Sequence, residues 1–347
     1  RTDSSAASDV YKRQEYNLID FNDMILKFIK SDKSPNFDVV FIDEAQDLSL
    51  MQWDMAKTIW NKTEDSFIAG DDDQAIFRWA GADVDSFIAQ KGLMMPLQQS
   101  HRIPAKVHNV AMGIINKIRN RIDKTWKPKV HEGSLSRYDE FEQIDMSNGE
   151  WLVLARTKYM LNDLEESLYR DGRYYVNKFK RTKEKELHYA AQDWENLRKG
   201  QPLAYKEVER IYSYMKDNTD KNKLKGMLKD SSYNIDTLKK DYGLKVDTPW
   251  FEAFDDAPSR DVNYLRKMRK NGEKLNEAPR ITLSTIHGAK GGESQNVVLL
   301  TDLSENTMKA YERNADDENR LFYVGATRTK EHLHIISPKQ EYKGYKL

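Results

Sequence analysis

The chain has 347 residues, enough for about two or three domains, and its 56 basic and 56 acidic residues cancel, so any nucleic-acid binding must come from local patches. The absence of cysteine excludes disulfides, thiolate metal sites and cysteine nucleophiles. No apolar run approaches about 18 residues and no signal peptide is present, so we expect a cytoplasmic protein with no membrane partner.

Residues 1–15 contain few apolar side chains and no periodicity, and we interpret them as a disordered or non-native leader. The rest alternates short apolar runs with amphipathic segments, which predicts an α/β protein. The expected divisions are a first α/β domain at 16–120, a linker at 121–150, a second α/β domain at 151–177 and 280–340, and a mainly helical insertion at 178–279.

Two short apolar runs, at residues 39–42 and 67–69, are typical of buried parallel strands. A helix is expected between them at 51–60, which completes a right-handed strand–helix–strand unit. A third short strand is expected at 93–98. Apolar spacing after Pro104 then predicts a helix through Ile118, with the proline in its first turn.

Acidic side chains follow both apolar runs, as Asp43 and Glu44 after the first and residues 71–73 after the second. Because the carboxyl ends of parallel strands meet at one sheet edge, these carboxylates are expected to lie together and to bind Mg²⁺ with phosphate. Asp43 would hold the metal and Glu44 would also contact it or polarise an attacking water, while Gln74 would sense a γ-phosphate. An acidic helix N-terminus is the alternative interpretation of Asp43 and Glu44.

Aromatic and basic residues near these acids suggest coupling to nucleic acid. Phe77 and Trp79 flank a cation and offer a platform for stacked bases, although such a pair is also common in cores. Arg328 lies in the second predicted domain, where it can act as an arginine finger only when two domains close on one nucleotide. The alternative is a surface arginine paired with Glu318 or Asp317.

The chain resembles the UvrD/Rep/PcrA-like family of superfamily 1 DNA helicases. The resemblance rests on six segments in the family's order, which are DEAQD at 43–47, GDDDQAIFRW at 70–79, QSHR at 99–102, VLART at 153–157, TIHGAKGGE at 285–293 and YVGATR at 323–328.

The resemblance implies two RecA-like parallel-sheet domains, the first incomplete, with the helical insertion in the second. It implies an ATP-dependent, Mg²⁺-dependent helicase or translocase on single-stranded DNA, with 3′→5′ polarity, acting at junctions of single-stranded and double-stranded DNA. By the same resemblance Arg102 and Arg328 contact phosphate and Glu293 contacts the nucleotide sugar. Arg156 and His287 then contact DNA, as does Thr285, which is suited to close approach of a sugar-phosphate backbone.

No G-x-x-x-x-G-K-[ST] loop occurs in the sequence, although the family uses this loop to hold the β- and γ-phosphates. We therefore expect a chain shortened on its N-terminal side, with exposed apolar residues on its first sheet, that alone neither hydrolyses ATP nor unwinds DNA. Two alternatives stay open. One is a metal-dependent nuclease built on Asp43, Glu44, Asp71 and Asp73, and the other is a non-catalytic module that binds DNA or a protein partner.

Overall fold

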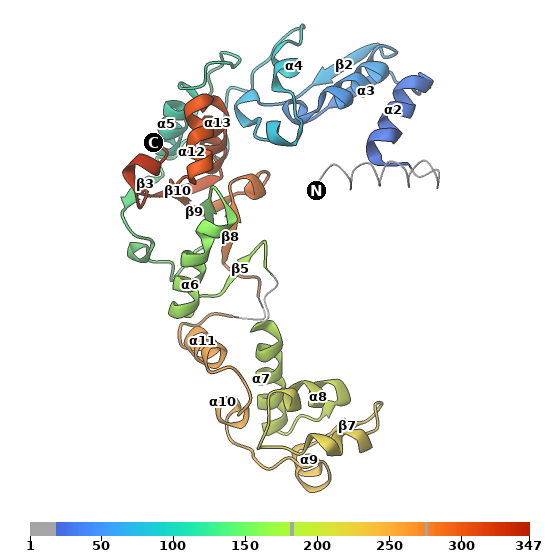
Figure 1. The fold of residues 1–347 in the computed structure, drawn as a ribbon, viewed down its shortest axis with the longest axis vertical. Helices are drawn as coiled ribbons and strands as arrows, with labels where there is room; N and C mark the ends of the chain where they lie inside the picture. The colour runs from blue at the N-terminus through green and yellow to red at the C-terminus, as the bar shows by residue number, and fades with distance from the viewer. Residues whose placement is uncertain (1–18, 181–183, 275–276) are drawn as a thin grey trace. The chain divides into compact units, whose positions relative to one another are not determined.

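The structure is a computed structural model that describes residues 19–180, 184–274 and 277–347. The leader expected at 1–15 lies outside the described residues. The chain divides into two compact units (Figure 1): unit 1 comprises residues 1–134, 303–331 and 346–347, and unit 2 comprises 135–302 and 332–345.

Unit 1 contains the predicted strand–helix–strand segment. Strands β1 (Val39–Ile42) and β2 (Asp65–Ile68) are paired in parallel, with Ile42 opposite Ile68, and helix α3 (Leu50–Trp60) connects them. Ser49 and Gln52 form a capping box at the start of α3, which satisfies two of its free backbone donors. An earlier helix, α2 (Phe21–Ser31), also begins with a capping box and packs against α3.

The two-stranded sheet exposes aromatic side chains. Phe41 and Phe67 stack with ring centroids 5.0 Å apart, yet 76% of Phe41 and 47% of Phe67 are accessible to solvent. The strand expected at 93–98 is absent from this described segment, so that prediction was wrong. Leu93 and Leu97 are almost fully exposed, and Pro96 lacks the N–H that a ladder needs.

The other α-helices among the described residues of unit 1 come from distant parts of the chain. They are α4 (Val84–Ile88), α5 (Ala105–Ile115), α12 (Glu305–Arg313) and α13 (Ala315–Ala326). Helix α5 confirms the helix predicted after Pro104, and its buried face packs on α13. This packing groups residues 303–331 with unit 1, which differs from the sequence-based division that assigned 280–340 to the second domain.

Unit 2 is built on a six-stranded sheet in the order β3-β10-β9-β4-β8-β5. The strands are β3 (Ser134–Tyr138), β4 (Trp151–Ala155), β5 (Tyr175–Asn177), β8 (Ile281–Thr285), β9 (Ser294–Leu300) and β10 (Thr329–Ile336). Central strand β4 is buried throughout and pairs in parallel with both β8 and β9, as its continuous apolar sequence predicts. Helix α6 (Asn162–Asp171) follows β4 and ends at Gly172 in a left-handed conformation.

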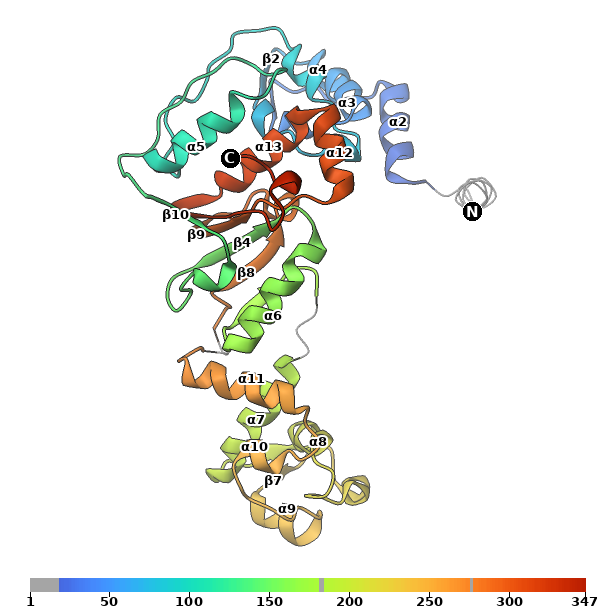
Figure 2. The same cartoon turned by 60° about the vertical axis from the view of Figure 1, so that its left-hand side comes forward.

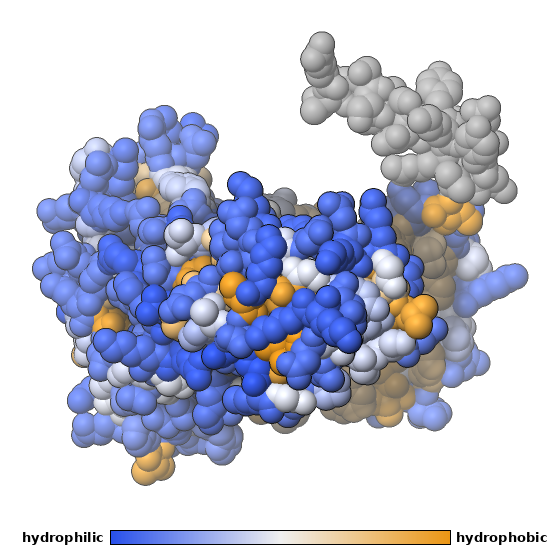
Figure 3. Space-filling view, turned by 90° about the horizontal axis from the view of Figure 1, so that it is seen from below, coloured by the Kyte–Doolittle hydropathy of each residue, from blue (hydrophilic) through white to orange (hydrophobic). Residues whose placement is uncertain are grey.

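The predicted insertion is mainly helical (Figure 2). Its elements are α7 (Glu184–Arg198), β6 (Leu203–Ala204), α8 (Tyr205–Ser213), β7 (Ser232–Tyr233), α9 (Ile235–Asp241), α10 (Trp250–Ala253) and α11 (Ser259–Lys270). Trp194 is fully buried in this region and donates a hydrogen bond from its Nε1 to the carbonyl of Thr248 at 2.9 Å. The face in Figure 3 is mostly hydrophilic, with small separate hydrophobic areas. Among the described helices, none is both long and apolar enough to cross a bilayer.

His334 in β10 is expected to make unit 2 sensitive to acid. Its ring lies 5.8 Å from that of Tyr138 and 5.1 Å from that of Trp151, and neither ring nitrogen has a hydrogen-bond partner among the described residues. Burial, together with the nearby His332, lowers the pKa of His334 to about 4. Between about pH 6.5 and pH 4 the unfolded chain therefore binds a proton that the folded chain does not.

Replacing His334 by phenylalanine is expected to remove about 2 kcal/mol of this acid destabilisation, after allowance for partial solvent access. Urea unfolding at pH 7.5 and pH 4.5 measures the effect as the change in unfolding free energy of His334→Phe relative to the wild type. His131→Phe, at an exposed histidine, is the control. An equal pH dependence in His334→Phe and the wild type contradicts the prediction.

Candidate functional site

The tips of β1 and β2 are joined by a buried glutamine. Gln46 donates from Nε2 to Glu44 Oε2 at 2.6 Å and accepts at Oε1 from the backbone N–H of Asp71 at 3.0 Å. A side chain at Gly70 would place its Cβ 2.5 Å from Gln46 Oε1, so the close approach requires glycine. The two acidic segments thus meet at one sheet edge, as the parallel pairing predicts.

Asp43 and Glu44 follow β1 directly and are both exposed. Asp43 Oδ1 accepts from the backbone N–H of Glu44 at 2.9 Å, and Glu44 adopts a left-handed backbone with φ of 51°. An exposed carboxylate at a strand tip fits a Mg²⁺ ion that keeps several of its waters. The geometry is therefore compatible with the metal role predicted for these residues.

Gln74 connects the second acidic tip to an arginine 254 positions later in the chain. Its Nε2 donates to Asp71 Oδ2 at 2.7 Å, and its Oε1 accepts from Arg328 Nη2 at 3.1 Å. Arg328 follows α13, is 2% exposed, and donates from Nε to the carbonyl of Val324 at 3.0 Å. The sequence-based division assigns Arg328 to the second domain, whereas its contacts group it with Gln74 in unit 1, since α13 packs on α5.

The two aspartates of η2 (Asp72–Gln74) and its N-cap Asp71 place carboxylate oxygens within 4.8 Å of one another, the kind of group that could hold a metal. Two cations occupy this cluster instead. Arg121 donates to both oxygens of the fully buried Asp73 at 2.9 and 2.8 Å. The Lys124 ammonium lies 2.9 Å from Asp73 Oδ2 and also pairs with Asp71 and Asp72.

These contacts set the charges in the cluster. Burial alone would raise the pKa of Asp73, but the hydrogen bond from Arg121 and the charge of Lys124 outweigh it and lower that pKa. Burial raises the pKa of Asp71 despite the opposing charge of Lys124. Because cations already satisfy these carboxylates, the cluster does not fit Mg²⁺, which also removes Asp73 from the ligands of the nuclease alternative.

Segment 119–124 carries these cations and was missed by the sequence analysis, which began a linker at 121. Its backbone is held by acceptors from two other segments: Asp316 accepts from the N–H groups of Arg119 and Asn120 at 3.2 and 3.1 Å, and Asp72 accepts from that of Ile122 at 2.8 Å. The signal available in the sequence was the pair of basic residues three positions apart, to be matched with the acidic run at 71–73.

Three other predicted site residues lie in unit 1: Arg102, Phe77 and Trp79. Arg102 is half-buried, and its backbone N–H donates to Ser100 Oγ at 3.3 Å. The rings of Phe77 and Trp79 meet edge to face with centroids 6.5 Å apart, and 75% of Trp79 is exposed. A single exposed aromatic face therefore projects from the segment that follows Gln74.

In unit 2, Arg156 and Thr285 lie at the carboxyl edge of the sheet, whereas Glu293 lies at the amino end of β9, at the opposite edge. Arg156 follows β4 and Thr285 ends β8, and these two strands are parallel neighbours. Thr285 Oγ1 accepts from the N–H of Gly288 at 3.1 Å, which folds the loop η7 (His287–Ala289) over the strand end. Glu293 is exposed directly before β9.

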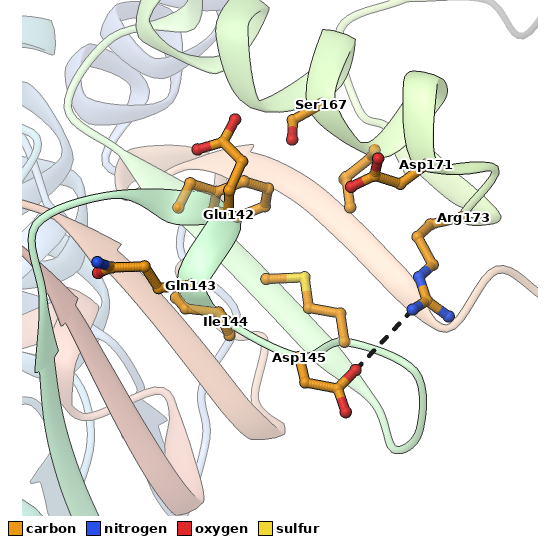
Figure 4. A pocket seen from close by; sticks show the side chains of 10 residues that line it. Glu142, Gln143, Ile144, Asp145, Ser167, Asp171 and Arg173 are labelled. Carbon is orange, nitrogen blue, oxygen red and sulfur yellow. Dashed lines mark ion pairs between the residues drawn. The ribbon is translucent and has the colours of Figure 1, made fainter.

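Unit 2 also contains a pocket of about 260 Å³ beside α6 (Figure 4). Asp145 and Arg173, which both line it, form an ion pair at 3.9 Å. Its lining includes none of the predicted site residues.

Comparison with known proteins shows similarity in both parts of the chain. Residues 7–94 match the UvrD/REP helicase N-terminal domain, and residues 156–340 match the UvrD-like helicase C-terminal domain. The chain is 22% identical to a probable DNA helicase II homolog of Rickettsia conorii, over 92% of this chain and 65% of that protein. It is 24% identical to the ATP-dependent DNA helicase PcrA of Bacillus subtilis, over 96% of this chain and 61% of that protein.

A third relative is the ATP-dependent DNA helicase srs2 of Schizosaccharomyces pombe, 23% identical over 93% of this chain and 50% of that protein. The chain therefore spans between half and two thirds of the length of these relatives.

Proposed function

The chain belongs to the UvrD-like helicase family, since a family domain covers more than half of its residues, and we propose that the activity of the whole protein is ATP-dependent movement along single-stranded DNA. Strand separation at junctions and 3′→5′ polarity belong to the same proposal. Unit 1 and the sheet of unit 2 would be the two RecA-like parts of this motor.

The nucleotide half of the proposal uses residues of unit 1 and also Glu293, which belongs to unit 2. Asp43 and Glu44 would hold Mg²⁺, which when bound supplies neutralisation of phosphate charge. Glu44 would also orient the attacking water and take its proton. Gln74, Arg102 and Arg328 would donate hydrogen bonds to the γ-phosphate, and an arginine in this role contributes about 10³–10⁵ in rate. Glu293 would contact the ribose.

The DNA half uses the exposed aromatic face and the sheet edge of unit 2. Phe77 and Trp79 would stack on bases, while Arg156, Thr285 and His287 would contact the sugar-phosphate backbone. The observation that carries the proposal is the continuity from Arg328 through Gln74 to Trp79: the Gln74 amide accepts a hydrogen bond from Arg328 and lies five residues before Trp79, which is 75% exposed.

Replacing Trp79 by alanine is expected to weaken single-stranded DNA binding by about 1–3 kcal/mol, the loss of one stacked base. Fluorescence anisotropy with a labelled oligonucleotide at fixed salt measures the effect. Tyr342→Ala, at another exposed aromatic, is the matched control and should bind as the wild type does. Equal affinities for Trp79→Ala and the wild type, or no binding by either, count against the DNA half of the proposal.

A further inference from the structure

Lys124 lies where a metal ion would lie among three carboxylates. Its Nζ is 3.1 Å from Asp71 Oδ1 and 2.9 Å from Asp73 Oδ2, and it also contacts Asp72 Oδ1. Only 18% of its side chain is exposed. Burying three carboxylates together is costly unless a cation compensates them, and Lys124 is the cation that contacts all three.

Asp71 divides its two oxygens between Lys124 and Gln74. Oδ1 faces the Lys124 ammonium and also accepts from the backbone N–H of Asp73 at 3.1 Å, and Oδ2 accepts from Gln74 Nε2 at 2.7 Å. An amide has a donor end and an acceptor end, so an ionised carboxylate at the donor end fixes which way the amide points. With Nε2 held by Asp71, Gln74 presents Oε1 to Arg328 Nη2 at 3.1 Å.

We propose that Lys124 is a positioning residue for Gln74: by pairing with Asp71 it keeps that carboxylate an acceptor and thereby sets the orientation of the Gln74 amide toward Arg328. The positioning role of Lys124 rests only on these contacts. Its importance for a nucleotide response rests on the proposed function, in which Gln74 and Arg328 meet the γ-phosphate.

A variant at Arg121 can separate the positioning role of Lys124 from a general contribution of the charged cluster to stability. Arg121 makes a two-pronged hydrogen bond to Asp73 in the same cluster, and the described contacts of its side chain do not include Asp71 or Gln74. A variant at Arg121 removes an ion pair to the buried Asp73 in the same cluster while leaving the Lys124–Asp71–Gln74 connection in place. It is therefore the matched control for Lys124.

The test is NMR of the full chain labelled with [¹⁵N]glutamine, with the side-chain amide of Gln74 assigned by its loss in Gln74→Met. In the wild type this resonance should be shifted from those of exposed glutamines and its protons should exchange slowly. In Lys124→Met the resonance should move toward the exposed set, with exchange faster by at least about tenfold, the equivalent of about 1.4 kcal/mol. Lys124→Arg should restore the wild-type signal, and Arg121→Met should retain it.

An unchanged Gln74 resonance in Lys124→Met overturns the proposal, as does an equal change in Arg121→Met. If Lys124→Met does not fold, Lys124→Gln replaces it, since glutamine keeps a donor and removes the charge. Titration of the wild type with Mg²⁺ and ATP then tests the proposed function separately. A Gln74 signal that depends on Lys124 but ignores ATP would count against contact of Gln74 with the nucleotide in this chain and leave the positioning role intact.

Discussion

Replacing Arg320 by methionine is expected to lower the free energy of unfolding by about 3–5 kcal/mol. Arg320 is 1% exposed in α13, donates from Nε to the carbonyl of Asp72 at 2.9 Å and from Nη2 to the carbonyl of Asn120. It therefore joins α13 to η2 and to segment 119–124. Methionine fills a similar volume but leaves both carbonyls, of which that of Asp72 is buried, without this donor.

Urea unfolding followed by circular dichroism measures the loss for Arg320→Met. Arg313→Met is the matched control, because Arg313 is exposed on the neighbouring α12 and its replacement should change stability by less than about 0.5 kcal/mol. Arg320→Lys should fall between the two, since a lysine ammonium keeps the charge but lacks the planar fork that reaches two carbonyls. Similar stabilities for Arg320→Met and Arg313→Met would refute the structural role of Arg320.

Replacing Asp73 by asparagine is expected to cost about 3 kcal/mol or more at pH 7. Asp73 is fully buried and receives two hydrogen bonds from Arg121 and an ion pair from Lys124. Asparagine is nearly isosteric, but it removes the negative charge and turns an N–H₂ group toward the cations. Arg121 then loses the carboxylate to which it donates, and Lys124 keeps only Asp71 and Asp72 as counter-charges.

The pH dependence of this loss has a defined sign. The folded-state pKa of Asp73 lies below its ordinary value of 3.8, so its stabilising contribution is complete above about pH 4 and is lost as the pH falls through the folded pKa. The stability difference between the wild type and Asp73→Asn should therefore be constant from pH 7 to pH 5 and shrink below pH 4. Asp54→Asn, at an exposed aspartate paired with Lys57, should show a small difference throughout. A difference that grows on acidification contradicts the assignment.

Local sequence determined the elements that carry the chemistry. Apolar runs with acids at their ends predicted β1 and β2, and their connection by a helix required the parallel pairing that brings Glu44 and Asp71 to one edge. The continuous apolar run at 151–155 likewise predicted a central parallel strand, and helical spacing predicted the insertion. The spacing of apolar residues and the acids that end each apolar run are local features, so they can be recognised directly in the sequence.

Tertiary structure alone decided which charges meet. Nothing in the periodicity of residues 119–124 shows that Arg121 and Lys124 enclose the aspartates, and nothing in the sequence around Arg328 places it on Gln74 in unit 1. The packing of distant helices such as α5 and α13 determines which groups lie beside a buried charge. A buried charge is stable only if an opposite charge or a hydrogen-bonding group lies close to it, because it has lost its contacts with water. The strand expected at 93–98 failed for a related reason: apolar residues form a strand only where a neighbouring strand satisfies their backbone.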